Sequence, residues 1–273
     1  MRFLLEPLDV TDLAGLTAAA RAAAGAGLDG LLLAESPALP APLVAAAALA
    51  GRAADVLVAA EIGLGDRHPL EVAEEAAVTD LVLAGRLILV VRPAGGAGER
   101  FAEAVDILRS AFAARPFRFE GEHWRVPANL PQNEWLPEEQ VRMMPAPAGA
   151  RLELWTSGAA GRAVALERAL GHLADAGDDA EALAAAWHEA AAAPAALGAP
   201  RARREAWAEA AGLVARLREG RESFGQEWAV VAAPVEAAGK LGSIVRPRVQ
   251  MHRLSPGLEQ FWDREQPWAP SPG

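Results

Sequence analysis

The sequence predicts an α/β protein with a closed, TIM-type (β/α)8 barrel, and three observations lead to that fold class. Apolar runs of strand length alternate with Ala-rich helical stretches, which is the order of consecutive βαβ units. Most of these runs are apolar at every position, as strands covered by helices on both faces require. Eight such runs can be counted, and a chain of 273 residues has the usual size of a closed eight-stranded barrel.

The first four strands and the helices between them carry the strongest signals. Pro69 suits the first position of a helix, where its missing N–H leaves no bond unmade, and Gly85 ends that helix because glycine adopts the left-handed conformation cheaply. We expect these strands at residues 2–6, 30–34, 56–60 and 87–91, and the helices at 11–24, 41–53 and 69–84.

The pattern changes after the fourth strand. A helix at about 99–114 is followed by a polar, aromatic segment that predicts a β-hairpin around Glu120 and Gly121. Because a proline-rich stretch comes next, we expect an insertion at about 115–150, between the fourth and fifth strands. The remaining elements are expected as strands at 152–156, 172–174, 228–232 and 248–253, a helix from about 161, and two Ala-rich helices over 178–219.

These elements predict a single barrel domain over residues 1–256, followed by a C-terminal tail at 257–273. The net charge of −10 argues against a nucleic-acid partner and against an anionic membrane surface, because both require a basic face. The chain has no cysteine, no signal peptide pattern and no apolar run of membrane-spanning length. We therefore expect a cytoplasmic protein.

Four segments resemble the bacterial luciferase-like flavin-dependent monooxygenases. They are HPLEVAEEAAVTDLVLAGRLILVV, ERFAEAVDILRSAF, FRFEGEHWRV and LELWTSGAAGRAVALERALGHLAD, in the order that the family has. The resemblance implies a (β/α)8 barrel that binds FMN, or alternatively the deazaflavin F420, at the C-terminal ends of its strands. It also implies a separate flavin reductase as partner. We expect a small, mainly apolar organic substrate and a homodimer.

The end of the third strand is the first place where the resemblance assigns a role. Ala59 and Ala60 would lie behind the flavin, with a non-prolyl cis peptide between Ala60 and Glu61. The structural alternative is an ordinary trans strand end. A carboxylate at Glu61 would repel an anionic reduced flavin, so it must be protonated, paired with a cation or turned away. We expect Glu61 to handle protons or bind substrate, and the alternative is a salt bridge to Arg92.

Two segments predict a phosphate site by resemblance and by chemistry. Arg92 closes the fourth strand, and its guanidinium suits a phosphate. The turn after the fifth strand offers small residues before a helix start, where backbone N–H groups and the helix dipole attract an anion. The cofactor-binding residues expected there are Thr156, Ser157, Gly158 and Gly161.

The end of the second strand departs from the family pattern. Luciferases place an acidic residue and then a catalytic His there, whereas this chain has Glu35 followed by Ser36. Help from a general base is therefore weakened, although both residues remain catalytic candidates beside Glu61. His68 is expected to be structural, and the remaining histidines show no spacing typical of a metal site.

Two functions stay open at this point. The first is a flavin- or F420-dependent oxidoreductase, most simply a monooxygenase. The second is a catalytically degenerate barrel that acts as a binding or accessory protein, a reading favoured by Ser36 and Glu61. A dinucleotide-binding domain is disfavoured because neither Gly-rich turn follows the first strand. For the dimer face, Trp187 and Trp207 are the candidates.

Overall fold

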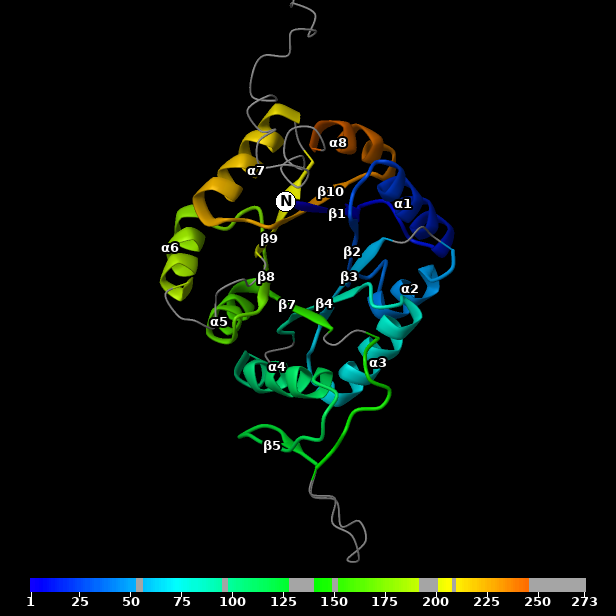
Figure 1. Ribbon diagram of the computed structural model, residues 1–273. Helices are drawn as coiled ribbons and strands as arrows, with labels where there is room; N and C mark the ends of the chain where they lie inside the picture. Colours follow the sequence, from blue (N-terminus) through cyan, green and yellow to red (C-terminus); the bar gives the residue numbers. More distant parts are fainter. Residues whose placement is uncertain are drawn as a thin grey trace, which may run out of the picture.

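The computed structural model describes residues 1–52, 56–94, 98–127, 140–148, 152–191, 201–207 and 210–245. Eight parallel strands close into one barrel in the order β1-β10-β9-β8-β7-β4-β3-β2, with helices around the outside (Figure 1). The predicted TIM-type α/β barrel is therefore confirmed. The described part of the chain contains no helix long and apolar enough to cross a membrane.

The elements follow the chain in a regular order. The barrel strands are β1 (Arg2–Pro7), β2 (Gly30–Ala34), β3 (Leu57–Gly63), β4 (Leu87–Arg92), β7 (Glu153–Ser157), β8 (Gly171–Ala174), β9 (Arg201–Ala206) and β10 (Trp228–Ala233). The helices are α1 (Leu13–Gly25), α2 (Pro42–Leu49), α3 (Pro69–Val82), α4 (Gly98–Phe112), α5 (Gly158–Arg168), α6 (Ala180–Ala191), α7 (Ala210–Phe224) and α8 (Ala238–Val245), with a 3-10 turn at Val235–Ala237 before α8.

Alternation along the strands produces two cores. One cluster fills the barrel interior and consists of strand residues alone, among them Leu4, Leu32 and Ala59. Trp155 and Trp228 meet there edge to face, with ring centroids 5.1 Å apart. The other cluster lies between the sheet and the helices and includes Ala60. The interior below the rim is thus a packed core and not a pore, as in other barrels of this size.

Helix α3 begins at Pro69, as the sequence predicts. His68 caps it, because its Nδ1 accepts the N–H of Leu70 at 3.2 Å, and Pro69 occupies the first turn. Gly85 has a left-handed backbone with φ of 78°, which returns the chain towards β4. The imidazole of His68 also packs edge-on against Trp124 at 5.1 Å, so this histidine has the structural role that we expected.

A β-hairpin stands between the fourth and fifth barrel strands, where the sequence predicts one. Its strands are β5 (Phe119–Glu120) and β6 (Arg125–Val126), paired antiparallel. Glu103 of α4 fixes the turn because its carboxylate accepts three successive backbone N–H groups, from Glu122 at 2.7 Å and from His123 and Trp124 at 3.0 Å each. Residues 128–139 of the expected insertion lie outside the described residues.

One prediction about the second half of the barrel is wrong, and two others lie outside the described residues. The chain at Arg201–Ala206 is the seventh barrel strand, β9, although we expected helix throughout 178–219. The strand expected at 248–253 lies outside the described residues, and so does the expected tail. The ring closes without them, because β1 pairs with β10 from Arg2 opposite Trp228 to Pro7 opposite Ala233.

Candidate functional site

Polar side chains gather inside the barrel at the C-terminal ends of its strands. Strand alternation places Glu61 on the same inward row as Ala59, and Glu6 on the same row as Leu4. Ser157 follows Trp155 inward, and Arg204 follows Ala202. The interior is therefore apolar in its middle layer and charged at this rim, where barrels of this kind carry their chemistry.

Arg204 is the centre of the rim cluster. Its guanidinium donates to Glu61 Oε2 at 2.5 Å, to Glu6 Oε2 at 2.8 Å and to Asp175 Oδ1 at 2.9 Å. Burial alone would lower the pKa of Arg204, but the carboxylates of Glu61 and Glu6 outweigh it and raise that pKa above its usual value. The arginine is therefore always charged, and it joins carboxylates from three other places on the ring.

Glu61 and Glu6 differ in their surroundings. Glu61 is only 5% exposed, and its second oxygen accepts the hydroxyl of Ser157 at 2.6 Å. The pKa of Glu6 is raised because burial disfavours its charge more than Arg204 supports it. One fixed carboxylate and one that takes up a proton more readily than usual thus share the same arginine.

The turn from β7 into α5 leaves the start of the helix without a side-chain cap. Ser157 stands at the cap position, but its hydroxyl goes to Glu61 instead of to the backbone of α5. Gly158 has φ of 75° and open space around the position of a Cβ, and Ala159 and Ala160 are exposed as well. The first N–H groups of α5 are therefore open to an anion.

Thr156 and Gly161 support this turn from below. Thr156 is fully buried on the helix side of β7, and its hydroxyl donates to the carbonyl of Gly161 at 2.7 Å. A Cβ on Gly161 would lie 3.1 Å from Thr156 Cβ, so glycine allows α5 to begin this close to the strand. His172 Nδ1 lies 3.2 Å from the same hydroxyl. These residues shape the turn and do not face the mouth.

Arg92 ends β4 beside this turn, because Val91 lies opposite Thr156 in the strand register. Its guanidinium contacts Glu35 Oε2 at 3.3 Å, across Gly63 of β3. Glu35 also accepts the N–H of Gly63 at 2.7 Å. Arg92 and the start of α5 therefore share one rim on neighbouring strands, although in this structure the guanidinium is held on the β2 side.

The structure contradicts two expectations about Glu61 and places Ser36 in a turn. The salt bridge between Glu61 and Arg92 is wrong, because Arg204 takes the place of Arg92 as the partner of Glu61. The cis peptide between Ala60 and Glu61 is wrong as well, because the cis bonds of the described chain precede Pro127 and Pro145. Ser36 lies at the rim but accepts the N–H of Leu39 at 3.1 Å within a turn.

The sequence reasoning missed Arg204, Glu6 and Asp175. Arg204 was missed because RARREA has no apolar run and stands among Ala-rich segments. One signal was available. The expected strands at 172–174 and 228–232 leave a gap far longer than the roughly 30 residues of one βα unit, so a strand was required between them.

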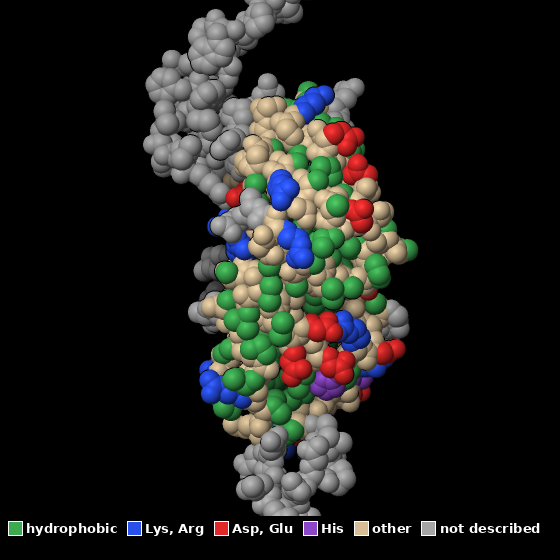
Figure 2. All heavy atoms as spheres, turned by 90° about the vertical axis from the view of Figure 1, so that its right-hand side faces the viewer, with side chains coloured by type: hydrophobic (Ala, Val, Ile, Leu, Met, Phe, Trp, Pro, Cys, Tyr) green, Lys and Arg blue, Asp and Glu red, His purple; other side chains and the backbone are tan. Residues whose placement is uncertain are grey.

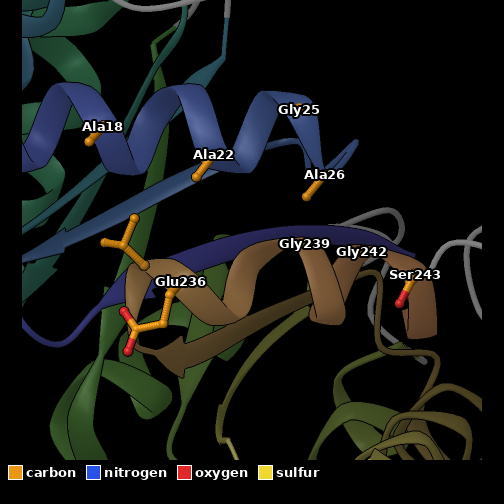
Figure 3. A pocket seen from close by; sticks show the side chains of 9 residues that line it. Ala18, Ala22, Gly25, Ala26, Glu236, Gly239, Gly242 and Ser243 are labelled. Atoms are coloured by element: carbon orange, nitrogen blue, oxygen red, sulfur yellow. The ribbon is translucent and has the colours of Figure 1, made fainter.

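A separate groove of about 720 Å³ lies outside the barrel, between α1 and α8 (Figure 3). Small residues line it, among them Ala18, Ala22 and Gly239, and Glu236 is the one charged residue among the described residues of its lining. Across the described ranges, no three His, Asp or Glu side chains come together as metal ligands. The rim cluster is therefore the candidate site.

The fold that carries this rim is the fold of luciferase-like monooxygenases and of an F420-dependent reductase. The chain is similar to monooxygenase RslO1 from Streptomyces bottropensis, with a TM-score of 0.69 and 16% identity over 93% of this chain and 100% of that one. The resemblance that the sequence predicts is confirmed in the fold. No protein-family model matches the sequence, and no curated protein does.

Two further structures indicate the range of cofactors among similar folds. The oxygenating constituent of 3,6-diketocamphane monooxygenase from Pseudomonas putida, solved with FMN, matches with a TM-score of 0.68 and 16% identity, over 91% of this chain and 99% of that one. The coenzyme F420 dependent tetrahydromethanopterin reductase from Methanopyrus kandleri matches with a TM-score of 0.61 and 13% identity, over 90% and 98%.

Proposed function

We propose that the chain is an oxidoreductase that holds FMN, or alternatively F420, at the C-terminal rim of its barrel. The observation that carries the proposal is the uncapped first turn of α5, which offers N–H groups and a positive dipole end to a phosphate. Arg92 ends the neighbouring strand, and its guanidinium would reach the same group by leaving Glu35, which it contacts at 3.3 Å. The fold similarity to a protein solved with FMN supports the same assignment.

The residues at the rim also fit the ring system of such a cofactor. A buried carboxylate at Glu61 would repel an anionic ring if it were alone, but Arg204 pairs with it at 2.5 Å and shares its positive charge with Glu6 and Asp175. Burial raises the pKa of Glu6, which favours the uncharged form of that carboxyl. The cofactor would supply the two-electron chemistry, and the protein supplies position and charge control.

The rim side chains of the protein would each have a role beside the cofactor. Arg204 holds Glu61 in one orientation, and Glu61 in turn orients the hydroxyl of Ser157 at 2.6 Å. Burial raises the pKa of Glu6, so this carboxyl takes up a proton at the rim more readily than an exposed glutamate does. We expect a small, mainly apolar organic substrate above this layer, with a separate reductase delivering reduced cofactor.

A titration of the purified protein with FMN, riboflavin and F420, followed by quenching of their fluorescence, tests the proposal. FMN should bind at least about tenfold more tightly than riboflavin, since the two differ only in the phosphate. Arg92→Gln should weaken the binding of FMN, whereas Arg100→Gln, in an exposed pair with Asp66, should not. Absence of binding by all three compounds would overturn the proposed function.

The second candidate is an accessory protein that binds the cofactor without turnover. It is favoured by the contacts of Glu61 and Ser36, which are both engaged within the chain. Reoxidation of reduced FMN by oxygen separates the two functions. An enzyme should change the rate of that reaction relative to free reduced FMN, and an accessory protein should leave it unchanged.

A further inference from the structure

A hollow of about 480 Å³ lies on the outside of the barrel, between the ends of α4 and α5 and the strand β5. Figure 1 shows α5 and α4 as neighbours outside the ring, with β5 beyond α4. Both helices end here before the chain enters β7 and β8, so the hollow is at the N-terminal end of the strands. It is therefore separate from the rim, and its size is typical of a small-molecule site.

One wall of the hollow is apolar. The side chains that form it come from the end of α4, from β5, from β7 and the residue before it, and from the second residue after α5. They are Phe112, Phe119, Leu152, Leu154 and Leu170. These groups suit the apolar body of a ligand.

The other wall is positively charged. Arg168 and Asp106 form a two-pronged ion pair, with Nε to Oδ1 at 2.8 Å and Nη2 to Oδ2 at 2.9 Å, so the carboxylate is already satisfied. Arg109 approaches that carboxylate only to 3.7 Å. Arg115 lines the same hollow and forms no ion pair within the described part of the chain.

Two of the three arginines of this wall, Arg109 and Arg115, are exposed and lack a close ion pair within the described part of the chain. Three arginines and one aspartate line the hollow. The C-terminal ends of α4 and α5 together contribute about one negative charge, at roughly half a unit each. Arg168 is paired with Asp106 and with Glu167, so the groups that face a ligand are the exposed guanidinium groups of Arg109 and Arg115.

We propose that this hollow binds a small amphiphilic anion, with a carboxylate or phosphate head on Arg109 and Arg115 and an apolar body against the Phe and Leu wall. The guanidinium groups recognise such a head through paired N–H donors. The site is independent of the cofactor assignment, because it lies at the opposite end of the barrel.

Calorimetric titration of the 273-residue chain with octanoate, octyl phosphate and 1-octanol tests the site. At least one of the two anions should bind about fivefold or more tightly than the alcohol, and the better anion identifies the head group. Arg109→Gln and Arg115→Gln should each weaken that binding about fivefold or more. Arg118→Gln is the matched control, because Arg118 pairs with Glu120 and does not line the hollow.

A second variant tests the apolar wall. Ala113 is exposed and lines the hollow, so Ala113→Trp should fill the space and abolish binding while leaving circular dichroism unchanged. Equal binding of anion and alcohol, or unchanged binding in both arginine variants, would overturn the proposal. Titration of FMN with the same variants should be unaffected, so failure here is distinguishable from failure of the proposed function.

Discussion

Arg204 is the residue on which the charged rim depends, because three carboxylates converge on it from separate elements. Removing one member of a buried ion pair leaves the other charged and unpaired, which destabilises strongly. Glu61 is the most buried of the three carboxylates and would suffer most.

We expect Arg204→Met to lower the free energy of unfolding by about 3 kcal/mol in urea denaturation at neutral pH. Adding Glu61→Gln to that variant should restore part of the loss, because the unpaired charge is removed with it. Arg100→Met breaks an exposed pair and should cost less than about 1 kcal/mol. Equal losses in Arg204→Met and Arg100→Met would contradict this account.

His172 makes stability depend on pH. Burial lowers its pKa to about 4, and its ring lies between Thr156 and Trp187. Because the folded-state pKa is below the unfolded value of 6.5, the stability due to neutral His172 is full above pH 6.5 and is lost as the pH falls towards 4. From these two values, lowering the pH from 7 to 5 should cost about 2 kcal/mol.

The measurement is urea unfolding of the wild type and of His172→Gln at both pH values. The difference between the two proteins should shrink by about the same 2 kcal/mol at pH 5. The control His123→Gln removes an exposed histidine and should keep the pH dependence of the wild type. An unchanged slope in His172→Gln would show that other groups cause the dependence.

At the scale of single elements, α5 offers a direct test of the phosphate site. Ala159→Glu places a negative charge in the exposed first turn, where it favours the helix dipole by about 0.5 kcal/mol. The same charge repels a phosphate. We therefore expect unchanged or slightly increased stability together with a loss of FMN affinity of about tenfold or more. Ala163→Glu, exposed further along α5, is the control that should keep the affinity.

The elements also show how far sequence reasoning reaches. β1 to β4 were predictable because GLLLA and LILVV are apolar runs bounded by turn residues, and their outward and inward faces are both covered. β9 was not, because its inward Arg204 serves the rim and its outward Arg203 and Glu205 form a buried ion pair at 3.4 Å. Apolar patterns do not identify a strand that carries charges on both faces, and the partners of Arg204 are distant in the chain.

The candidate site was likewise predictable only in part from the sequence. Ser157 and Glu61 were predicted as rim residues and contact each other, since each ends an apolar strand. Their common partner could not be predicted, because Arg204 is 143 residues from Glu61 in the chain. Which side chains meet across the barrel depends on the order of the strands. Because β9 was not predicted as a strand, its place in that order could not be predicted either.

At the scale of the whole molecule, the exposed apolar side chains concentrate on one face. Figure 2 views the side of the barrel that carries α1, α2 and α3, where hydrophobic side chains gather. Val44 of α2 is 70% exposed, and Val78, Leu81 and Val82 of α3 are 47%, 43% and 49% exposed. Patches of this kind mark interfaces. Trp187, which we expected at a dimer face, is instead buried and stacks on His172, so that expectation is wrong.

We expect the predicted homodimer to form through this α2 and α3 face, because a twofold axis brings one patch onto its own copy. The double variant Val78→Glu and Val82→Glu should be monomeric in sedimentation analysis, with unchanged circular dichroism. Leu13→Glu, which alters an exposed residue of α1, should remain dimeric. A dimeric double variant would exclude this face, and a monomeric wild type would exclude the dimer.

The pairing of β9 on both sides has a consequence for how the rim keeps its polarity. Arg204 lies opposite Val230 of β10, and Ala202 lies opposite Leu173 of β8. Sliding β9 by one residue would reverse its two faces, turning Glu205 inward towards Glu6 and Glu61 and burying Arg204 outside. Ring closure forbids such a slip, because both neighbours would have to move as well. Substitutions that weaken the strand pairing closing the barrel, even far from the rim, should therefore change the charge of the rim, although no rim residue is replaced.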